Sequence, residues 1–188
     1  MNRVLAIAAV CAVAVSTPAW AGLAVGAKAP DITAKAYENG NPSNFHLADA
    51  LKKGPVVLYF FPGAFTPGCN VEAQQFAASI DKYKAAGAQV IGVTGGFGNT
   101  ARSSKAEGGL EEAVRDFSKE HCNGKFPVAA VSVDTIKAYG VELTQRPGWS
   151  NRTSYVIDKS GNVVMAFENL SPDGHVDKTL AAVQALKK

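Results

Sequence analysis

Cysteine and histidine are scarce in this chain, and neither is arranged as a metal site. The 188 residues include three cysteines and three histidines, and no two cysteines have C-x-x-C spacing. The histidines, His46, His121 and His175, are far apart and lack the close ligand spacing of a structural zinc site. We therefore expect neither a structural zinc site nor the dithiol chemistry of a C-x-x-C pair.

Clustered charge is also missing. The 19 lysines and arginines and 16 aspartates and glutamates give a net charge of +3, and the basic residues are scattered along the chain. Without a basic patch, nucleic acid is not an expected partner. The composition, 47% hydrophobic and 19% charged, is ordinary for one globular α/β domain. A chain of this length can bury a full core without disulfides or metals.

A long apolar run lies at the amino terminus. It covers residues 4–15, follows a single positive charge at Arg3, and is broken by the S-T-P sequence of residues 16–18. The A-W-A sequence that ends at Ala21 is a small-x-small cleavage site. The run is too short and wrongly flanked for a transmembrane helix. We therefore predict that residues 1–21 are a secretory signal peptide, cleaved after Ala21.

Cleavage there leaves residues 22–188 as a single domain, periplasmic in a bacterium or secreted, with no membrane attachment. Lipid attachment at Cys11 is disfavoured, because Val10 is a poor residue before a lipidated cysteine. Since Cys11 leaves with the signal peptide, the mature chain keeps Cys69 and Cys122. In an oxidising compartment such a pair is most often a disulfide.

The apolar pattern of residues 22–188 predicts alternating strands and helices. We expect three main strands, at 56–61, 89–94 and 126–133, and two long helices, at 71–86 and 110–121. A strand hairpin at 153–157 and 163–167 and a final helix from residue 175 follow. Shorter elements are strands at 32–34 and 44–47 and helices at 48–53 and 134–139. Strands joined through a helix run parallel with a right-handed crossover. The order β-α-β-α-β, then β-β-α, predicts a thioredoxin-like α/β fold, with a mixed central sheet and helices on both faces. Residues 95–109 form a long Gly- and Ser-rich loop, and loops of that length are usually functional or mobile.

Residues 61–74, F-P-G-A-F-T-P-G-C-N-V-E-A-Q, carry the strongest chemical signal. They lead from a buried strand through a loop with two prolines into a helix, which places Cys69 in the first helical turn. Free backbone N–H groups and the helix dipole favour an anion there, and the thiolate is the nucleophilic form of cysteine. Thr66 lies three residues earlier, so its hydroxyl could turn toward the sulfur. The sequence predicts a reactive thiol in a shaped pocket.

The pattern Pro62-x-x-x-Thr66-x-x-Cys69 resembles the P-x-x-x-T-x-x-C signature of the peroxiredoxins, thiol peroxidases of the thioredoxin fold. The sequence F-T-P-G-C-N-V-E-A is similar to that of the bacterioferritin-comigratory, or Q-type, branch, and the sequence P-G-A-F-T-P is similar to that of the peroxiredoxin 5 branch. The resemblance covers the chain from about residue 22 to its end. It implies reduction of hydrogen peroxide or organic hydroperoxides without a metal, haem or flavin cofactor.

The resemblance also implies a role for individual residues. Cys69 matches the peroxidatic cysteine, which attacks the terminal peroxide oxygen. Thr66 matches the threonine that bonds the sulfur and the peroxide, and Pro62 the proline that shields the pocket from water. Arg152, in R-T-S-Y-V-I-D, matches the distant arginine that completes the site. Glu72 matches the polar partner that helps position this arginine.

The second cysteine departs from one subtype of the Q-type branch. That subtype has its resolving cysteine five residues after the first, where this chain has Gln74. The remaining candidate is Cys122, near the end of the helix before the third strand, which resembles another subtype of the branch. A disulfide between Cys69 and Cys122 would require partial unwinding of the first long helix, because the Cα atoms must come within about 7 Å. An inert Cys122 in a one-cysteine mechanism is the alternative.

The sequence leaves alternatives for two site residues and for the function. Arg146 competes with Arg152 for the arginine role, and Glu72 could be a solvated carboxylate in the first helical turn. The expected reductant is a thioredoxin-like or glutaredoxin-like protein or a small thiol, and the protein is expected to be a monomer or homodimer. The rival functions are a thiol–disulfide oxidoreductase of the same fold and a non-catalytic module with a structural disulfide between Cys69 and Cys122.

Overall fold

The computed structural model describes residues 22–95 and 109–187. The predicted signal peptide (1–21) and residues 96–108 of the predicted loop lie outside the described residues. Within the described ranges, no helix is long and apolar enough to cross a membrane.

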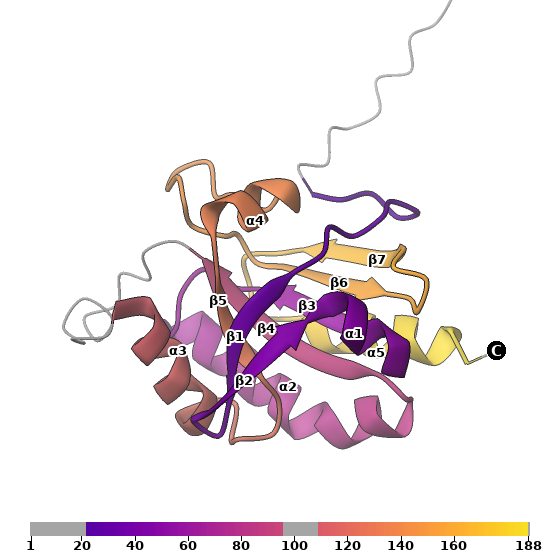
Figure 1. The fold of residues 1–188 in the computed structure, drawn as a ribbon, viewed down its shortest axis with the longest axis horizontal. Helices are drawn as coiled ribbons and strands as arrows, with labels where there is room; N and C mark the ends of the chain where they lie inside the picture. The colour runs from indigo at the N-terminus through magenta and orange to yellow at the C-terminus, as the bar shows by residue number, and fades with distance from the viewer. Residues whose placement is uncertain (1–21, 96–108, 188) are drawn as a thin grey trace, which may run out of the picture.

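The structure is built on a seven-stranded sheet with the order β2-β1-β5-β4-β3-β6-β7 (Figure 1). The strands are β1 (Thr33–Glu38), β2 (Asn41–His46), β3 (Val56–Phe60), β4 (Gln89–Gly95), β5 (Val128–Val131), β6 (Thr153–Ile157) and β7 (Val163–Glu168). The three central strands, β5, β4 and β3, run parallel to one another, and every other pairing is antiparallel. All five residues of β3 are buried, as expected for a strand covered on both faces.

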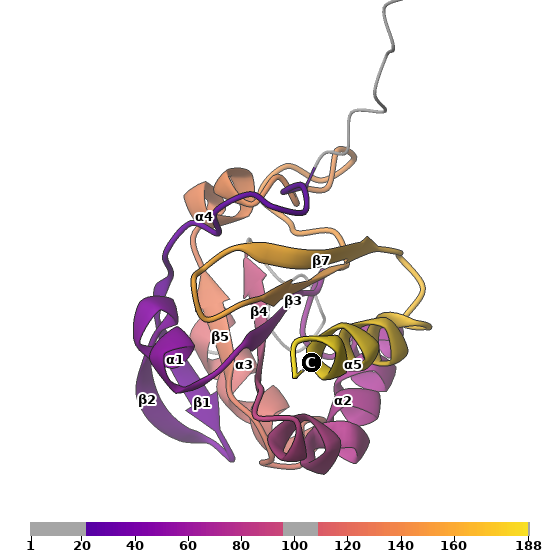
Figure 2. The same ribbon diagram turned by 90° about the vertical axis from the view of Figure 1, so that its right-hand side faces the viewer.

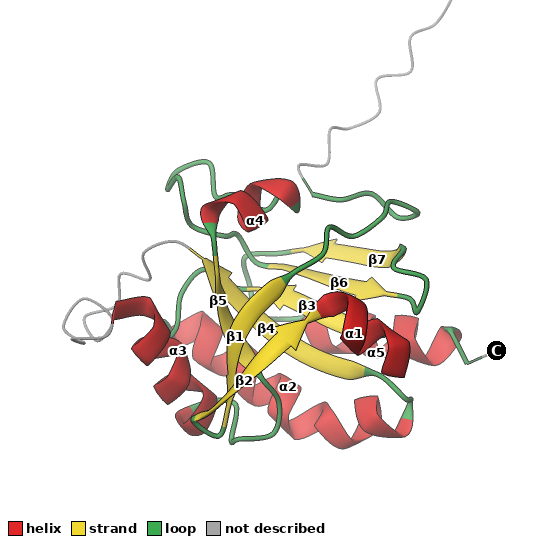
Figure 3. Cartoon of the chain, viewed as in Figure 1, coloured by secondary structure: helices red, strands yellow, loops and turns green. Residues whose placement is uncertain are grey.

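Helices cover both faces of this sheet (Figures 2 and 3). They are α1 (Leu47–Lys53), α2 (Pro67–Ala85), α3 (Gly109–Glu120), α4 (Val133–Ala138) and α5 (His175–Ala185). One apolar cluster joins α2, α3 and α5 to the sheet, and a second joins α1 and α4 to the opposite face. The predicted α/β class, with a mixed sheet and helices on both faces, is confirmed.

The first hairpin differs from its sequence prediction. β1 and β2 are both longer than the strands expected at 32–34 and 44–47, and they pair along their whole length from Thr33↔His46 to Glu38↔Asn41. The turn shrinks to Asn39 and Gly40, which both have positive φ angles (52° and 76°). An Asn-Gly pair in this conformation joins two strands with a two-residue turn, so the neighbouring polar residues are strand and not loop.

The third central strand is shorter than predicted. β5 covers Val128–Val131, where residues 126–133 were expected. Pro127 precedes it, and Ser132 follows it as the N-cap of α4, accepting a hydrogen bond from the backbone N–H of Thr135 at 3.2 Å. The cap ends the strand because its hydroxyl satisfies a helix N–H that has no partner inside the helix.

Candidate active site

The start of α2 places Cys69 inside the protein. Thr66 is the N-cap in an extended conformation, Pro67 is the first helical residue, and Cys69 is the third. Proline suits the first helical position because its fixed φ fits the helix and it has no N–H to satisfy. Cys69 is 1% exposed. The predicted position of the thiol in the first turn of a helix is confirmed.

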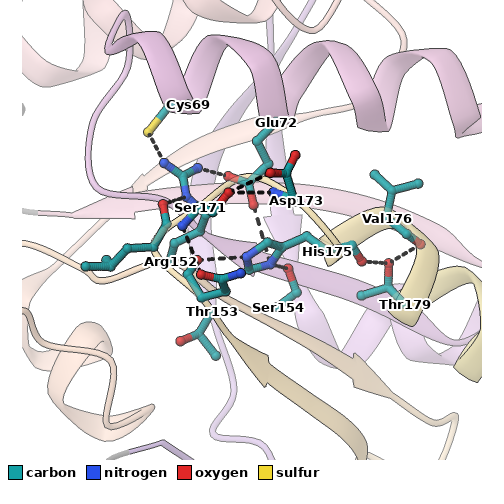
Figure 4. Close-up of polar contacts among 12 residues, drawn as sticks. Cys69, Glu72, Arg152, Thr153, Ser154, Ser171, Asp173, His175, Val176 and Thr179 are labelled. Carbon is teal, nitrogen blue, oxygen red and sulfur yellow. Dashed lines mark hydrogen bonds and ion pairs between the residues drawn. The ribbon is translucent and has the colours of Figure 1, made fainter.

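Strand register brings Arg152 to this thiol. β6 pairs antiparallel with β3 so that Thr153 lies opposite Phe60, the last residue of β3. Arg152 precedes β6 and therefore lies beside the loop that leads into α2. Its Nη2 donates a hydrogen bond to the Cys69 Sγ at 3.4 Å (Figure 4).

The Arg152 guanidinium is also held from two other directions. Its Nη1 donates to the carboxylate of Glu72, and its Nε donates to the backbone carbonyl of Leu170 at 2.9 Å. Its side chain is 5% exposed. Three partners, two on α2 and one after β7, therefore fix the plane of the guanidinium, with one edge directed at the sulfur.

The competing arginine lies elsewhere. The Arg146 guanidinium stacks over the ring of Trp149, 4.9 Å from its centroid, and Arg146 is exposed. Of the two candidates, the structure places Arg152 at Cys69.

Glu72 is fully buried one helical turn after Cys69. The interpretation of Glu72 as a solvated carboxylate is therefore wrong. Residues three apart on a helix share one face, so Glu72 and Cys69 both reach Arg152. Burial raises the pKa of the Glu72 carboxyl to about 8, while the charge and hydrogen bond of Arg152 oppose that rise.

The predicted orientation of Thr66 is not found. Its hydroxyl donates to the backbone carbonyl of Gly63 at 3.0 Å, so its proton points into the loop and not at Cys69. Pro62 is half-buried at the start of this loop, and its carbonyl accepts a hydrogen bond from Thr94 on β4 at 3.5 Å. Both residues therefore shape the loop beside the thiol.

His175 is a buried residue of this region that the sequence reasoning missed. It begins α5 and is completely buried, with its Nδ1 3.6 Å from the Glu72 Oε1 (Figure 4). Nδ1 is also 2.8 Å from the hydroxyl of Ser154, and Nε2 is 3.0 Å from the carbonyl oxygen of Asn169. No motif marks this histidine, and its only sequence signal is its place at the start of the last predicted helix.

Cys122 lies in the turn after α3 and is fully buried. Its backbone N–H donates to the carbonyl of Phe117 at 3.3 Å, and burial raises the pKa of its thiol. Cys69 and Cys122 belong to the same apolar cluster, and both thiols are free in the structure.

A buried thiol at a helix start, hydrogen-bonded by an arginine beside a mixed α/β sheet, is an arrangement suited to an enzyme that uses a cysteine sulfur as its nucleophile. Residues 25–166 match the AhpC/TSA family, and the chain belongs to this family, the peroxiredoxins. The protein is therefore a thiol peroxidase with a thioredoxin-like fold.

Its relatives agree with the Q-type resemblance. The chain is 33% identical over 169 residues to the chloroplastic peroxiredoxin Q of Sedum lineare, covering 83% of this chain and 82% of that protein. It is 33% identical over 164 residues to the chloroplastic peroxiredoxin Q of Arabidopsis thaliana, covering 85% of this chain and 67% of that protein. The crystal structure of peroxidoxin BcpB from Mycobacterium tuberculosis has the same fold, with a TM-score of 0.71 and 24% identity over 87% of this chain and 98% of that one.

Proposed function

We propose that this protein is an exported peroxidase that reduces hydrogen peroxide or small organic hydroperoxides, with Cys69 as the attacking sulfur. The observation that carries the proposal is the 3.4 Å hydrogen bond from Arg152 to the Cys69 Sγ, inside a buried site at the start of α2. A cation held against a buried sulfur stabilises the thiolate, which is the nucleophilic form.

The first half of the cycle is a displacement at oxygen. The Cys69 thiolate attacks the terminal oxygen of the hydroperoxide, an S–O bond forms, and the O–O bond breaks. The peroxide is reduced to an alcohol or water after its leaving oxygen takes a proton, and Cys69 is oxidised to a sulfenic acid. Charge moves from the sulfur to the departing oxygen, so a donor that can reach both atoms stabilises the transition state.

Arg152 fits that task because its position is already set. Its bonds to Glu72 and Leu170 leave Nη2 directed at the sulfur, so little reorganisation is needed as the charge moves. Removal of one such preorganised donor from an oxyanion hole costs about 3 kcal/mol in other enzymes. Glu72 contributes to the reaction by positioning this arginine.

Thr66 and Pro62 would act on the substrate side. The Thr66 hydroxyl is bonded to Gly63 in the present state and has to rotate away to meet a peroxide oxygen or the sulfur. Its two lone pairs also let it accept a hydrogen bond from the hydroperoxide while it donates to Gly63. Pro62 is expected to keep water out of the pocket.

Cys122 is the proposed resolving residue. Its thiol attacks the sulfur of the Cys69 sulfenic acid, forming a disulfide and releasing water. Both cysteines lie in one apolar cluster, which supports the pairing. Burial disfavours the Cys122 thiolate, so resolution requires local opening at the start of α2 or the end of α3. A thioredoxin-like or glutaredoxin-like protein or a small thiol would then reduce the disulfide.

The test follows one turnover by thiol counting and mass spectrometry after one equivalent of hydrogen peroxide. The wild-type protein should lose two thiols and form the disulfide between Cys69 and Cys122. Cys69→Ser should lose none, and Cys122→Ser, as the matched control, should react at the wild-type rate but stop at the sulfenic acid. Rapid oxidation of the Cys69→Ser protein would contradict the assignment, and a sulfenic acid as the wild-type product would remove Cys122 from it.

The export proposal has a separate test. It rests on the predicted signal peptide of this chain, whereas the peroxiredoxin Q relatives are named chloroplastic. The full chain, expressed in a bacterium with a periplasm, should be recovered there with Gly22 as its first residue. Recovery from the cytoplasm with Met1 or Asn2 retained would contradict export and leave the peroxidase proposal intact.

A further inference from the structure

We propose that His175 is a positioning residue: its Nδ1 and the Glu72 Oε1 hold one proton between them, which leaves the charge of Arg152 free for Cys69. This inference rests on the proposed function of Cys69 and extends the site inward to α5. It assigns a role to a buried histidine that the peroxide chemistry itself does not use.

The geometry singles out the Glu72 Oε1. The other carboxyl oxygen of Glu72 accepts from Arg152, whereas Oε1 is buried and has no hydrogen-bond partner among the described residues. Its neighbour is the Nδ1 of His175 at 3.6 Å, and both side chains are completely buried (Figure 4). A buried polar atom without a partner is costly, and a small approach of these two atoms makes a hydrogen bond if one of them carries a proton.

The contacts of the imidazole determine where its hydrogen lies. A backbone carbonyl can only accept, so the Nε2 of His175 must donate to the oxygen of Asn169. In the neutral ring Nδ1 is then an acceptor with a single lone pair, and both the Ser154 hydroxyl at 2.8 Å and the Glu72 Oε1 at 3.6 Å lie beside it. An ionised Glu72 would turn a second acceptor toward Nδ1, so two lone pairs would face each other in a buried site. One proton on Oε1 removes that conflict by donating to Nδ1.

Within residues 22–95 and 109–187, few other charged groups face the His175 ring. Glu72 approaches from α2 and Arg152 from the segment before β6, while β7 contributes the uncharged ring of Phe167, with its centroid 4.8 Å from that of His175. Lys178 of α5 lies over the Phe167 ring, 4.9 Å from its centroid, and Asp173 accepts a hydrogen bond from the hydroxyl of Ser171.

Those surroundings determine the balance of charge at the sulfur. With one proton between Glu72 and His175, the pair carries no net charge, and the positive charge of Arg152 is matched by the Cys69 thiolate. Without that proton, the negative charge of the Glu72 carboxylate offsets the positive charge of Arg152. The electrostatic stabilisation of the sulfur and of the departing oxygen is then weaker. The attraction between buried charges is strong because screening by water is weak.

The titration of both groups agrees with this placement of the proton. Burial raises the pKa of Glu72 to about 8, and burial together with the nearby Arg152 charge lowers the pKa of His175 to about 4. At neutral pH the proton therefore belongs on Glu72, with His175 as its acceptor.

The test uses two variants that keep different nitrogen contacts. His175→Asn puts an amide near the place of Nδ1 and can still accept from Glu72, whereas His175→Gln reaches the place of Nε2 and keeps the bond to Asn169. The measurement is the single-turnover rate constant of reduced protein with hydrogen peroxide from pH 5.5 to 9.5. His175→Asn should stay within about 3-fold of wild type at neutral pH, and His175→Gln should be about 10-fold slower or more.

The pH profile separates positioning from folding. The wild-type rate should fall as pH rises through the value at which Glu72 ionises, and in His175→Gln this fall should move to lower pH by at least about one unit. Equal rates in both variants, or an unshifted profile, would overturn the proposal. Wild-type protein that does not consume peroxide would instead contradict the proposed function.

A measurement without catalysis covers the case in which His175→Gln does not fold. The ¹³C resonance of the Glu72 carboxyl in labelled wild-type protein should titrate with a midpoint above pH 6. The ¹⁵N spectrum should show His175 neutral, with its hydrogen on Nε2, at pH 7. A Glu72 midpoint below pH 5 would overturn the proposal.

Discussion

Arg152 makes three hydrogen bonds through three different nitrogens, to Cys69, Glu72 and the Leu170 carbonyl. This arrangement depends on the planar, forked shape of the guanidinium. A lysine ammonium carries the same charge but is compact and has no fixed plane, so it cannot keep all three partners at these positions. The contribution of Arg152 is therefore geometric as well as electrostatic.

We predict that Arg152→Lys lowers the rate constant of Cys69 oxidation by peroxide about 100-fold, because one preorganised donor is lost at the sulfur. Stopped-flow mixing of reduced protein with excess hydrogen peroxide measures this rate constant. Arg146→Lys is the matched control, because Arg146 is exposed and stacked on Trp149, and it should react at the wild-type rate. A similar loss in both variants would show that the arrangement at Cys69 is not the cause.

At the scale of elements, the site depends on how closely α2 approaches the start of β6. Gly68, in the first turn of α2, lies against the guanidinium of Arg152: a Cβ at this position would be 3.0 Å from Nη2. Arg152 cannot easily move away, because Glu72 and Leu170 hold its other nitrogens. Glycine at this position therefore lets the helix start close enough for the sulfur to reach the arginine.

We predict that Gly68→Ala slows the reaction with peroxide about 10-fold while the free energy of unfolding stays within about 1 kcal/mol of wild type, because alanine favours the helix while its methyl group displaces Nη2. Peroxide kinetics and urea unfolding of the same preparation measure the two quantities. A variant with the wild-type rate would mean that Arg152 adapts to the extra carbon. One that loses both activity and several kcal/mol of stability would mean that the helix start itself is damaged.

The resolving step also belongs to this scale. Cys69 is in the first turn of α2 and Cys122 follows α3, so the proposed disulfide joins the ends of two helices that flank one apolar cluster. Formation of that bond is expected to move the Cys69 sulfur away from Arg152. Oxidation is therefore expected to break the hydrogen bond between Arg152 and Cys69, which gives the reductant access to the sulfur.

At the scale of the whole molecule, a buried carboxyl makes stability depend on pH. The pKa of Glu72 rises from 4.5 to about 8 on burial, so between these pH values the folded protein keeps a proton that the unfolded chain releases. The unfolded state then binds fewer protons, and stability falls as pH rises through this window. The contribution is fully present below about pH 4.5 and is lost above about pH 8.

We predict that the unfolding free energy of wild type relative to Glu72→Gln decreases with pH across that window, by up to about 1.4 kcal/mol per unit, because the glutamine has no proton to release. Urea unfolding of both proteins at pH 5, 6, 7 and 8 gives this difference, in which His175, present in both, cancels to first order. A difference that does not change with pH, or that increases, would mean that Glu72 is ionised in the folded protein.

The sequence alone determined the strand, loop and helix around Cys69, with Pro62 and Thr66 at their places in the motif. These features follow from local rules: a buried run forms the strand, prolines punctuate the loop, and a proline begins the helix. The helix order and the mixed sheet were predictable for the same reason. The short turn at Asn39 and Gly40 shows the limit of such rules. Pairing between β1 and β2 extends both strands into polar residues that the local pattern assigned to a loop.

Only the tertiary structure decided which distant residues meet the thiol. The choice of Arg152 over Arg146 comes from the register between β3 and β6, which also brings this arginine to the buried carboxylate of Glu72. His175 reaches Glu72 because α5 lies against α2 and β6. Such contacts join residues far apart in the chain. The motifs around Arg152 and Glu72 could nominate these two residues but could not show that they meet, and no local pattern pointed to His175 at all.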